Sequence, residues 1–458
     1  MKKCYWLLAA GGVLLLAGCA SPAPRKAYAD LEKTAGQRMS TPPRFGAAGE
    51  LAVKERTKVL LSSGALTADS AVELALLNNP SLAAEGEQIA VARADLAQES
   101  LAANPQIHYG LRRGGGMTGY EFSALMDFMS LATQPLRHSV ASARYEQERL
   151  RLSQDVLDLA DQVKSAFYAA QAAEQRAALS RTAYEGFQAA AELLKRQRTA
   201  GNLSALDAAR ETEAAERSAV GLARAGAAAV QARERLAALI GVQDMGPWIL
   251  PADFAQPPAA EPPLAQLEET ALRQRWDLDA ARREPTILKD ELTLNRVNLF
   301  GPVSAGFDAE KGIGERPGSG PAVEFSLPLF NQRLASSARI KARMRQSALT
   351  VAALEAQARL DVRTAYSELT AAREVADRYQ TALLPLSQTV AQETLKNYDF
   401  MLLGVYDVLR ARREQFEAQA DYIDALRDYW TARAELERAL GGVIPAEPAP
   451  APQQGEKT

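Results

Sequence analysis

The sequence predicts a mainly α protein with a small β part, in which a unit of long coiled-coil helices is duplicated and carries two β-hairpins in all. Three observations lead to this fold class. The two halves of the 458-residue chain match each other at a nearly constant offset. Apolar residues recur over long stretches at alternating steps of three and four. Each half also contains two short segments in which apolar and polar residues alternate.

The first 18 residues have the pattern of an export signal. Two lysines precede an apolar run, Trp6–Ala17, that is too short to span a bilayer. Leu16-Ala17-Gly18-Cys19 then resembles the lipobox of bacterial lipoproteins. The resemblance implies cleavage before Cys19 and a covalent diacylglycerol and N-acyl chain, such as palmitate, on that cysteine; no other cofactor is expected. The alternative is that Cys19 is only a small residue near an ordinary cleavage site.

The mature chain would contain no disulfide, because the only other cysteine, Cys4, leaves with the signal. The net charge of −3 is made of both signs spread along the chain, and no basic nucleic-acid surface is expected. No apolar stretch after Cys19 reaches the roughly 18 residues of a membrane helix, so a membrane crossing would need strands. We expect residues 19–65 to form an extended, lipid-anchored tether and residues 443–458 a disordered tail.

The body of the chain consists of two copies of one unit, at residues 66–241 and 264–442. Asp207 matches Asp407 and Gly241 matches Gly441, an offset of 200 residues. Farther upstream Val163 matches Val362, so the offset there is 199. Residues 242–263, between the copies, contain prolines that preclude a continuous helix and form a linker.

Each copy begins with an amphipathic helix. In the first copy Thr67 is a plausible N-cap with Asp69 in the first turn. The helix is interrupted at Asn78-Asn79-Pro80 and resumes afterwards. The alternating segments follow, at about 104–130 in the first copy and 302–330 in the second.

The alternating segments have the weak signature of outer-membrane strands, apolar toward lipid and polar toward a lumen. Half-buried hairpins of a soluble sheet explain the alternation equally well. Between the first two segments, GGGMTG at 114–119 fits a dinucleotide-binding string, but a loop between strands offers no helix N-terminus to a phosphate, so we reject that interpretation.

Very long helices follow the strands. From Leu152 to Ala177, and from Val351 to Ala376, apolar residues are spaced by four and three, which is typical of a coiled-coil seam. A helix over about 139–199 would be roughly 90 Å long, more than a single globular domain contains. In each copy a turn then connects this helix to one that returns.

Membrane strands require a closed barrel, because an open edge leaves backbone groups unpaired in lipid. Two hairpins supply four strands, too few to close, whereas three chains would supply about twelve, an even number within the known range. The seamed helices would close into a tube below. The sequence therefore predicts a cyclic oligomer, with the homotrimer as its smallest sensible form.

The ordered set of motifs resembles the TolC-like outer membrane efflux protein family, in its lipoprotein branch. After the signal and lipobox come LTADSAVELALLNNPSL, SLPLFNQR before a long helix, AGNLSALDAAR and RLAALIG, and the resemblance covers about 66–442. It implies a trimeric channel-tunnel: a 12-strand β-barrel in the outer membrane, continuous with a periplasmic α-helical barrel. It also implies that the chain is a passive exit duct of a tripartite efflux system, working with a periplasmic adaptor (membrane fusion) protein and an inner-membrane pump.

The resemblance also assigns roles to the turns between the long helices. It implies that Asp407 faces the pore at the periplasmic mouth and that Asp207 bonds across to the other turn. Arg410 stands where some relatives carry a second acid. The resemblance further implies that the tip turns dock the adaptor, and we expect this of the following residues: Gly201, Leu203, Ser204, Leu403 and Gly404.

A simpler interpretation of both aspartates remains open. Each would sit in the first turn of a returning helix, where the macrodipole favours an acid. Met401 replaces the glycine of the first copy, so we expect the second turn to differ in backbone shape. No catalytic or metal-ligating constellation is evident, and we predict that the protein is not an enzyme. The alternative function is that of a non-pore periplasmic coiled-coil lipoprotein acting as a spacer or scaffold.

Overall fold

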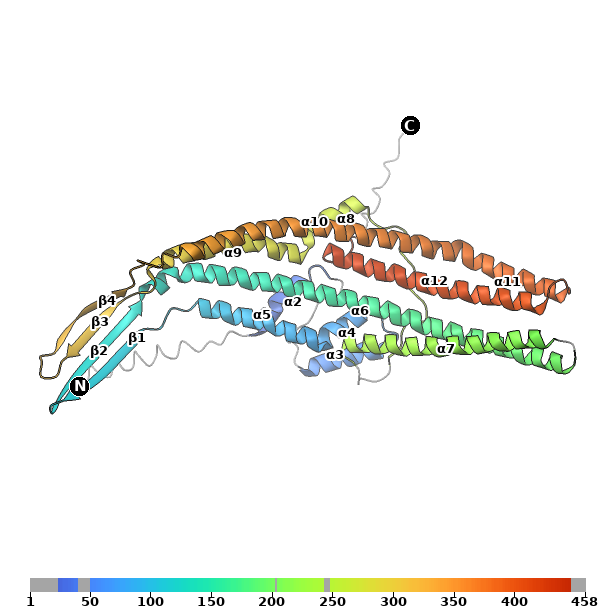
Figure 1. Ribbon diagram of the computed structural model, residues 1–458, viewed down its shortest axis with the longest axis horizontal. Coiled ribbons are helices and arrows are strands. Elements are labelled where there is room, and N and C mark those ends of the chain that lie inside the picture. Colours follow the sequence, from blue (N-terminus) through green and yellow to red (C-terminus); the bar gives the residue numbers. More distant parts are fainter. Residues whose placement is uncertain (1–23, 40–49, 202–203, 243–247, 446–458) are drawn as a thin grey trace, which may run out of the picture. The chain divides into compact units, whose positions relative to one another are not determined.

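The computed structural model describes residues 24–39, 50–201, 204–242 and 248–445 (Figure 1). They fall into two compact units, each built from several chain segments. Unit one contains the described residues of 1–31, 85–152 and 277–353, and unit two contains the remainder. The predicted signal, Cys19, and the tail from residue 446 onward lie outside the described residues.

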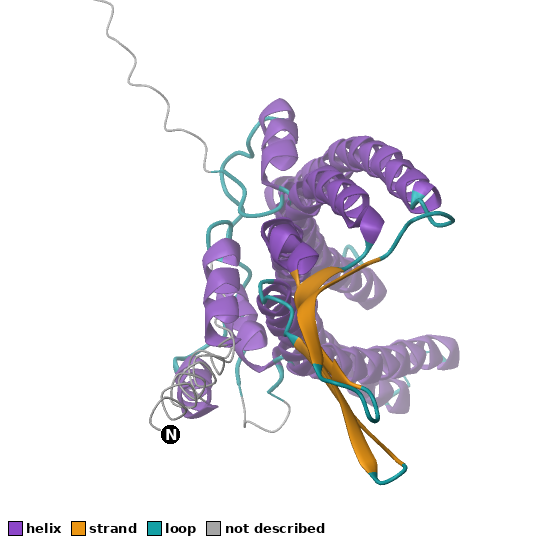
Figure 2. Ribbon diagram, turned by 90° about the vertical axis from the view of Figure 1, so that its left-hand side faces the viewer, coloured by secondary structure: helices purple, strands orange, loops and turns teal. Residues whose placement is uncertain are grey.

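Unit one carries a single four-stranded antiparallel sheet of order β1-β2-β3-β4. The strands are β1 (Gln106–Gly114), β2 (Met117–Asp127), β3 (Val303–Lys311) and β4 (Gly318–Phe325). β2 pairs with β3, so the hairpins of the two copies join into one twisted sheet (Figure 2). Apolar side chains are exposed at alternate positions of β1, at Ile107, Tyr109 and Leu111.

The glycine-rich stretch at 114–119 is the hairpin turn between β1 and β2. Gly114 pairs with Met117, and the two residues between them, Gly115 and Gly116, have φ of 56° and 75°. Positive φ at both central positions is the geometry of a type I′ turn, which glycine adopts without steric cost. The stretch therefore has a structural role in the sheet.

Helices complete unit one. They are α5 (Pro80–Glu99), the first part of α6 (Phe128–Thr199), α9 (Trp276–Val297) and the first part of α10 (Leu334–Arg378). Leu288 and Leu292 of α9 pack with Ile340 of α10 in a small core. Gln147 of α6 donates to the backbone oxygen of Ala280, at 3.1 Å.

The predicted extended tether over 19–65 is wrong for its described parts, which contain two helices, α2 (Pro24–Ala35) and α3 (Glu50–Ser62). Ala27, Leu31 and Ala35 recur at steps of four and are fully buried, so α2 presents an apolar stripe that packing stabilises. In unit one the hydroxyl of Tyr28 donates to Glu87, at 2.6 Å. The described residues of α2 are therefore a packed part of the fold.

The start of α6 also differs from the prediction of about 139, because α6 begins at Phe128, directly after β2. The backbone N–H of Ser130 donates to the Asp127 carboxylate at 3.1 Å, which caps the first turn. Pro135 lies inside the helix. The aspartate cap and the end of β2 set the boundary.

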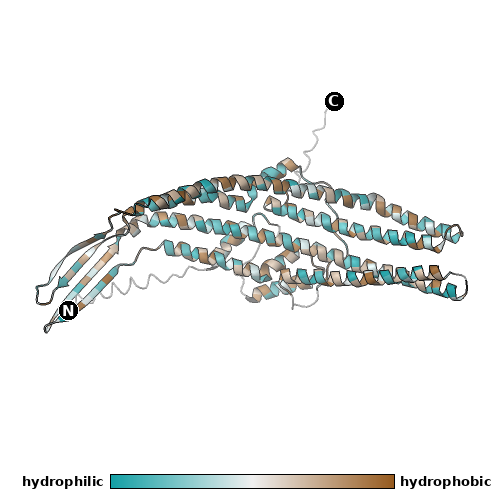
Figure 3. Ribbon diagram, in the orientation of Figure 1, coloured by the Kyte–Doolittle hydropathy of each residue, from teal (hydrophilic) through white to brown (hydrophobic). Residues whose placement is uncertain are grey.

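Unit two consists of two long helical hairpins with shorter helices beside them (Figure 1). The first hairpin joins the remainder of α6 to α7 (Ala205–Ile240). The second joins α10, a π-helical turn η2 (Tyr379–Leu383) and α11 (Leu384–Asp399) to α12 (Val405–Leu440). The shorter helices that lie wholly in unit two are α3, α4 (Ala68–Asn78) and α8 (Leu264–Gln274). Figure 3 shows polar and apolar residues interspersed along the long helices.

The predicted local signals of α4 are present. Thr67 is the N-cap, forms a capping box with Ser70, and accepts from the Ser70 N–H at 3.1 Å. The helix ends at Asn78 and α5 begins at Pro80. The α7 C-cap, Gly241, packs so closely on α4 that an added Cβ would lie 2.4 Å from the Asn78 oxygen.

The main core of unit two lies between α8, α10 and α12. Its fully buried members include Leu267, Val362, Leu369 and Tyr429. Ile444, which the sequence places in the disordered tail, belongs to this core, so that prediction is wrong for the residues just after α12. The linker runs along the same helices, and Phe254 is buried with Ala376 and Leu426.

Over the described part of the chain, no helix is both long and apolar enough to cross a bilayer.

Candidate functional site

The predicted site residues gather at two turns at the same end of unit two (Figure 1). We call residues 200–204, between α6 and α7, the first tip turn, and residues 400–404, between α11 and α12, the second tip turn. Leu203 lies outside the described residues. The other predicted residues of both turns are described.

Asp407 caps the N-terminus of α12 from within its own first turn. Its Oδ2 accepts from the backbone N–H of Gly404 at 3.2 Å. Its Oδ1 accepts from the Arg410 guanidinium at 2.7 Å. The carboxylate therefore satisfies one of the free N–H groups of the helix start and is also partly neutralised by Arg410.

Asp207 has the matching position in the first tip turn, but its contacts differ. Ser204 is the N-cap of α7 and accepts from the Asp207 N–H at 3.1 Å. The Ser204 hydroxyl donates to the Asp207 carboxylate at 2.6 Å. Arg210 lies 3.7 Å from that carboxylate, farther than Arg410 lies from Asp407. Within one chain, both aspartates therefore lie in the first turn of a returning helix, as the simpler interpretation expects. Their roles at a pore stay predictions.

The second tip turn does not differ in backbone shape at Met401, contrary to our expectation. Met401 has φ of 56° and Gly201 has φ of 82°, so both residues adopt the left-handed conformation. The N–H of Met401 donates to the oxygen of Tyr398, and that of Leu402 to the oxygen of Asn397, both at 2.8 Å. These bonds provide hydrogen-bond donors for backbone carbonyls at the end of α11. They hold Met401 in the left-handed conformation, which residues other than glycine rarely adopt.

The second tip turn exposes a run of large apolar side chains. Phe400, Met401 and Leu402 are mostly exposed, and Met401 is 93% exposed. Exposed apolar clusters mark interaction surfaces more often than isolated exposed residues do. The first tip turn has small or polar residues at its described positions, so the two turns present different chemistry.

A polar cluster between α7 and α12 was not predicted from the sequence. Burial raises the pKa of Tyr406, and the negative charges of Asp207 and Glu211 raise it further. The Tyr406 hydroxyl oxygen is buried and has no hydrogen-bond partner among the described residues. Glu211 is itself buried, which raises the pKa of its carboxyl, while the charge of Arg413 acts in the opposite direction. The spacing of apolar residues along α12 gives Tyr406 no special position, so the sequence offers no signal for this cluster.

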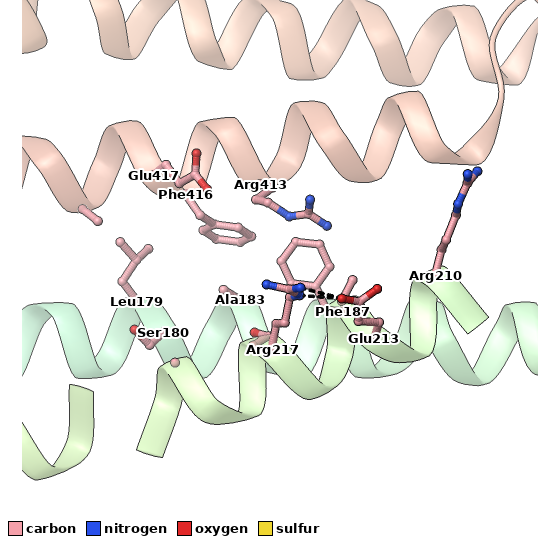
Figure 4. Close-up of a pocket in the computed structure, with 14 residues that line it drawn as sticks. Leu179, Ser180, Ala183, Phe187, Arg210, Glu213, Arg217, Arg413, Phe416 and Glu417 are labelled. Atoms are coloured by element: carbon pink, nitrogen blue, oxygen red, sulfur yellow. Dashed lines mark hydrogen bonds and ion pairs between the residues drawn. The ribbon is translucent and has the colours of Figure 1, made fainter. Parts of the chain in front are cut away.

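A groove of about 570 Å³ lies beside this cluster, between the first hairpin and α12 (Figure 4). The aromatic rings of Phe187 and Phe416 are directed into it, and the Arg413 guanidinium lies 5.4 Å from the centre of the Phe187 ring. Arg217 and Glu213 pair at its edge at 2.6 Å. The lining of the groove is mixed, with aromatic rings beside charged side chains.

The described residues offer no cluster of three or more histidine, cysteine, aspartate or glutamate side chains that could hold a metal ion. The described tip residues offer groups for electrostatic and conformational roles. These groups are paired charges, helix caps and an apolar surface.

Residues 269–442 match the outer membrane efflux protein family. Among solved structures, the chain is similar to a membrane protein from Pseudomonas aeruginosa, with 20% identity, a TM-score of 0.67 and coverage of 82% of this chain and 92% of that one. It is also similar to the CmeC outer membrane channel of Campylobacter jejuni, with 14% identity, a TM-score of 0.72 and coverage of 82% and 86%.

A third similar structure is the open state of the MtrE outer membrane channel of Neisseria gonorrhoeae, with 18% identity, a TM-score of 0.65 and coverage of 82% and 89%. No curated protein matches the chain by sequence. At these identities the structural likeness establishes the fold. With the family match, it confirms the predicted fold class and the resemblance to TolC-like efflux proteins.

Proposed function

We propose that this protein, whose residues 269–442 form an outer membrane efflux protein domain, is the outer-membrane channel of a tripartite efflux system. It would be a passive exit duct for substrates delivered by an inner-membrane pump through a periplasmic adaptor. The observation that carries the proposal is the pairing, in one chain, of a four-stranded antiparallel sheet with two long helical hairpins. A spacer or scaffold lipoprotein would need the hairpins but leaves the sheet without a role.

The sheet supports a homotrimer. β1 and β4 are its edge strands and pair on one side only. Ile107 and Tyr109 on β1, and Val323 and Phe325 on β4, are exposed apolar residues on these edges. Three copies joined edge to edge would form a closed barrel of about twelve strands with no free edge and an apolar outer face. The proposed location is the outer membrane, with the helical hairpins in the periplasm and Cys19 carrying the lipid anchor.

The tip supports a controlled periplasmic mouth. In a threefold assembly each tip residue occurs three times around one axis, so three Asp407 carboxylates and three Arg410 guanidiniums would surround the opening. The Asp407–Arg410 pair, at 2.7 Å, makes such a ring less acidic than three free carboxylates would be. The exposed apolar residues of the second tip turn and the neighbouring groove offer a surface for the adaptor.

Conductance of the purified lipoprotein in planar bilayers tests the proposal. We expect detergent-stable, heat-modifiable trimers that conduct and that multivalent cations block from the periplasmic side. Asp407→Ala should weaken the block, whereas Arg410→Ala should strengthen it, because the carboxylate is then unpaired. Glu393→Ala, which removes an exposed acid of α11, is the matched control and should leave the block unchanged. A monomer that conducts nothing would refute the channel and favour the spacer.

A further inference from the structure

The start of α10 carries a concentration of positive charge. Between Glu324 and Glu355 the sequence contains no acidic residue, whereas it contains five basic ones: Arg333, Arg339, Lys341, Arg343 and Arg345. Among the described residues, none of these five side chains forms an ion pair. Four of them are exposed, and Arg333 is partly exposed. Like charges four residues apart destabilise a helix, so this cluster is unfavourable for α10 by itself.

The matching stretch of the first repeat is balanced in charge. Both α6 and α10 contain the sequence Ser-Ala-Arg, which is followed in each by a buried residue. In the first copy Glu146 and Glu148 come next, and each pairs with an arginine three residues further along α6. In the second copy Lys341 and Arg343 occupy these positions, counted from the shared motif. The positive cluster is therefore a property of the second repeat and not of the shared fold.

An exposed apolar surface precedes the basic cluster. The exposed apolar row of β4 continues past the last residue of the strand, Phe325. Leu327 and Leu329 follow at alternate positions, and Phe330 is fully exposed. α10 then begins at Leu334, at the end of the sheet where β4 ends (Figure 1). If this apolar row faces lipid, the start of α10 lies at the level of the lipid headgroups.

The helices of unit one form a curved layer in the order of the strands. Arg137 of α6 pairs with Glu99 of α5 at 3.3 Å, and Arg144 of α6 pairs with Glu291 of α9. α9 in turn packs against Ile340 of α10. A groove of about 890 Å³ is lined by residues of all four helices. The layer therefore curves around the groove, which marks its concave face.

The exposed cations of α10 are divided between the two faces of this layer. Arg343 lines the groove and so lies on the concave face. Arg339, four residues earlier, lies on the same side of the helix. Lys341 and Arg345 are each two residues from Arg343, which is a rotation of about 200° around the helix, so both lie on the convex face. When three such layers close into a tube, the convex faces form its outer surface.

We propose that Lys341 and Arg345 bind anionic phospholipids in the leaflet on the periplasmic side of the outer membrane. This rests on the proposed function, which places the sheet in that membrane and the long helices in the periplasm. At 1.5 Å per residue, Lys341 and Arg345 lie about 11 and 17 Å along α10 from its start. The headgroup region of a leaflet is about 5 to 8 Å thick. Lys341 reaches it by extending its side chain, and Arg345 attracts it across about one Debye length.

The chemistry of the pair selects headgroups with a net negative charge. An ammonium group and a guanidinium group both bind phosphate oxygens well. Phosphatidylethanolamine carries its own ammonium beside its phosphate and is neutral overall, whereas phosphatidylglycerol has a net negative charge. Each cation near an anionic membrane surface contributes about a fivefold preference. We therefore expect up to about a 25-fold preference for phosphatidylglycerol from the two cations of one chain at low salt.

A tryptophan in the exposed apolar row measures which lipid lies beside the pair. Phe330→Trp is placed in phosphatidylethanolamine vesicles that contain a small fraction of one brominated lipid, which quenches tryptophan on contact. Brominated phosphatidylglycerol should quench the new tryptophan several-fold more than the same fraction of brominated phosphatidylethanolamine. The protein with Phe330 unchanged supplies the fluorescence of the other tryptophans, which is subtracted. About 1 M sodium chloride should remove the preference, because the Debye length is then only about 3 Å.

Two double variants of the reporter protein lose the same charge on opposite faces of α10. Lys341→Gln/Arg345→Gln should lose the preference for phosphatidylglycerol. Arg339→Gln/Arg343→Gln, on the concave face, is the matched control and should keep it. Equal quenching by the two lipids before either change, a preference that salt leaves unaltered, or an equal effect of the two variants would overturn the proposal.

A neighbouring copy of the chain is the competing partner for these cations. If Lys341→Gln/Arg345→Gln loses the trimer while the lipid preference stays, the pair binds that copy, and the lipid proposal is wrong. Conductance of the same vesicles separates this proposal from the proposed function. If neither brominated lipid quenches the new tryptophan and the protein conducts nothing, both fail. If the protein conducts and both lipids quench equally, only the lipid site fails.

Discussion

Replacing Glu261 with glutamine should release the inter-repeat linker from the helices of unit two. The Glu261 side chain is only 5% exposed, and both of its oxygens lie 2.6 Å from the Arg433 guanidinium. It also accepts from the Tyr429 hydroxyl at 2.7 Å and lies 3.8 Å from Arg373. One buried carboxylate of the linker thus joins α10 and α12.

The cost follows from what the substitution leaves behind. Glutamine retains the shape and can still accept hydrogen bonds through its one amide oxygen, but the charges of Arg433 and Arg373 lose their counterion. Removing one partner of a buried ion pair costs about 3 to 5 kcal/mol. Both arginine side chains are 21% exposed and keep some water, so we expect the lower end, about 3 kcal/mol, or roughly 150-fold in the local opening equilibrium.

Hydrogen exchange of the purified protein measures this opening directly. Amides of the linker that are held against α6 and α12, such as those around Phe254, should exchange roughly 150-fold faster in Glu261→Gln. Glu268→Gln is the matched control, because it breaks a pair of similar length, with Arg363 at 2.6 Å, whose arginine is exposed. The reasoning fails if both variants change linker exchange equally, or if neither does.

Four further substitutions test other features of unit two. Burial raises the pKa of Asp161 from 3.8 to about 6, so the free energy of unfolding falls as the pH rises through this range. Asp161→Asn should therefore increase the free energy of unfolding by about 2 to 3 kcal/mol at pH 8 and change it little at pH 4, which thermal unfolding at the two pH values measures. Met401→Gly should relieve left-handed strain of about 1 kcal/mol and slow amide exchange in the second tip turn. Gly241→Ala, with its Cβ 2.4 Å from the Asn78 oxygen, should lower the unfolding temperature, whereas Gly221→Ala, in open space on α7, should raise it.

Local signals explain how much of this fold could be predicted. The Thr67 cap and the break before Pro80 are properties of a few adjacent residues, and both appear in the structure. The coiled-coil seams and the alternating strand segments were predicted from the periodicity of apolar residues, which can be read from the sequence without knowing the tertiary structure. The contacts of α2 could not be predicted, because its short apolar stripe has meaning only against the surface that covers it.

The π-turn is a different case, because its signal was present in the sequence. The change of offset from 199 to 200 between the copies is a one-residue insertion within a predicted helix. Sequence comparison alone cannot place such an insertion, since a residue added anywhere in the interval gives the same offsets. The π-helical turn at Tyr379–Leu383 places it, because there the N–H of Leu384 donates to the oxygen of Tyr379, five residues back instead of four.

The two tip turns indicate where functional signals should be sought in a duplicated chain. An aspartate in the first turn of a helix is favoured by the helix itself, so the recurrence of Asp207 as Asp407 reflects a shared fold before any shared function. The informative positions are those at which the copies differ. The N-cap is Ser204 in the first copy and Gly404 in the second, and the arginine lies 3.7 Å from the aspartate in the first copy and 2.7 Å in the second. The outgoing helix is a continuous α-helix in the first copy and contains a π-helical turn in the second. All three differences concern the same end of unit two. The second hairpin has the cap without a side-chain hydrogen bond, the acid with the closer arginine and the π-helical turn, so we expect any functional difference between the two repeats at this end.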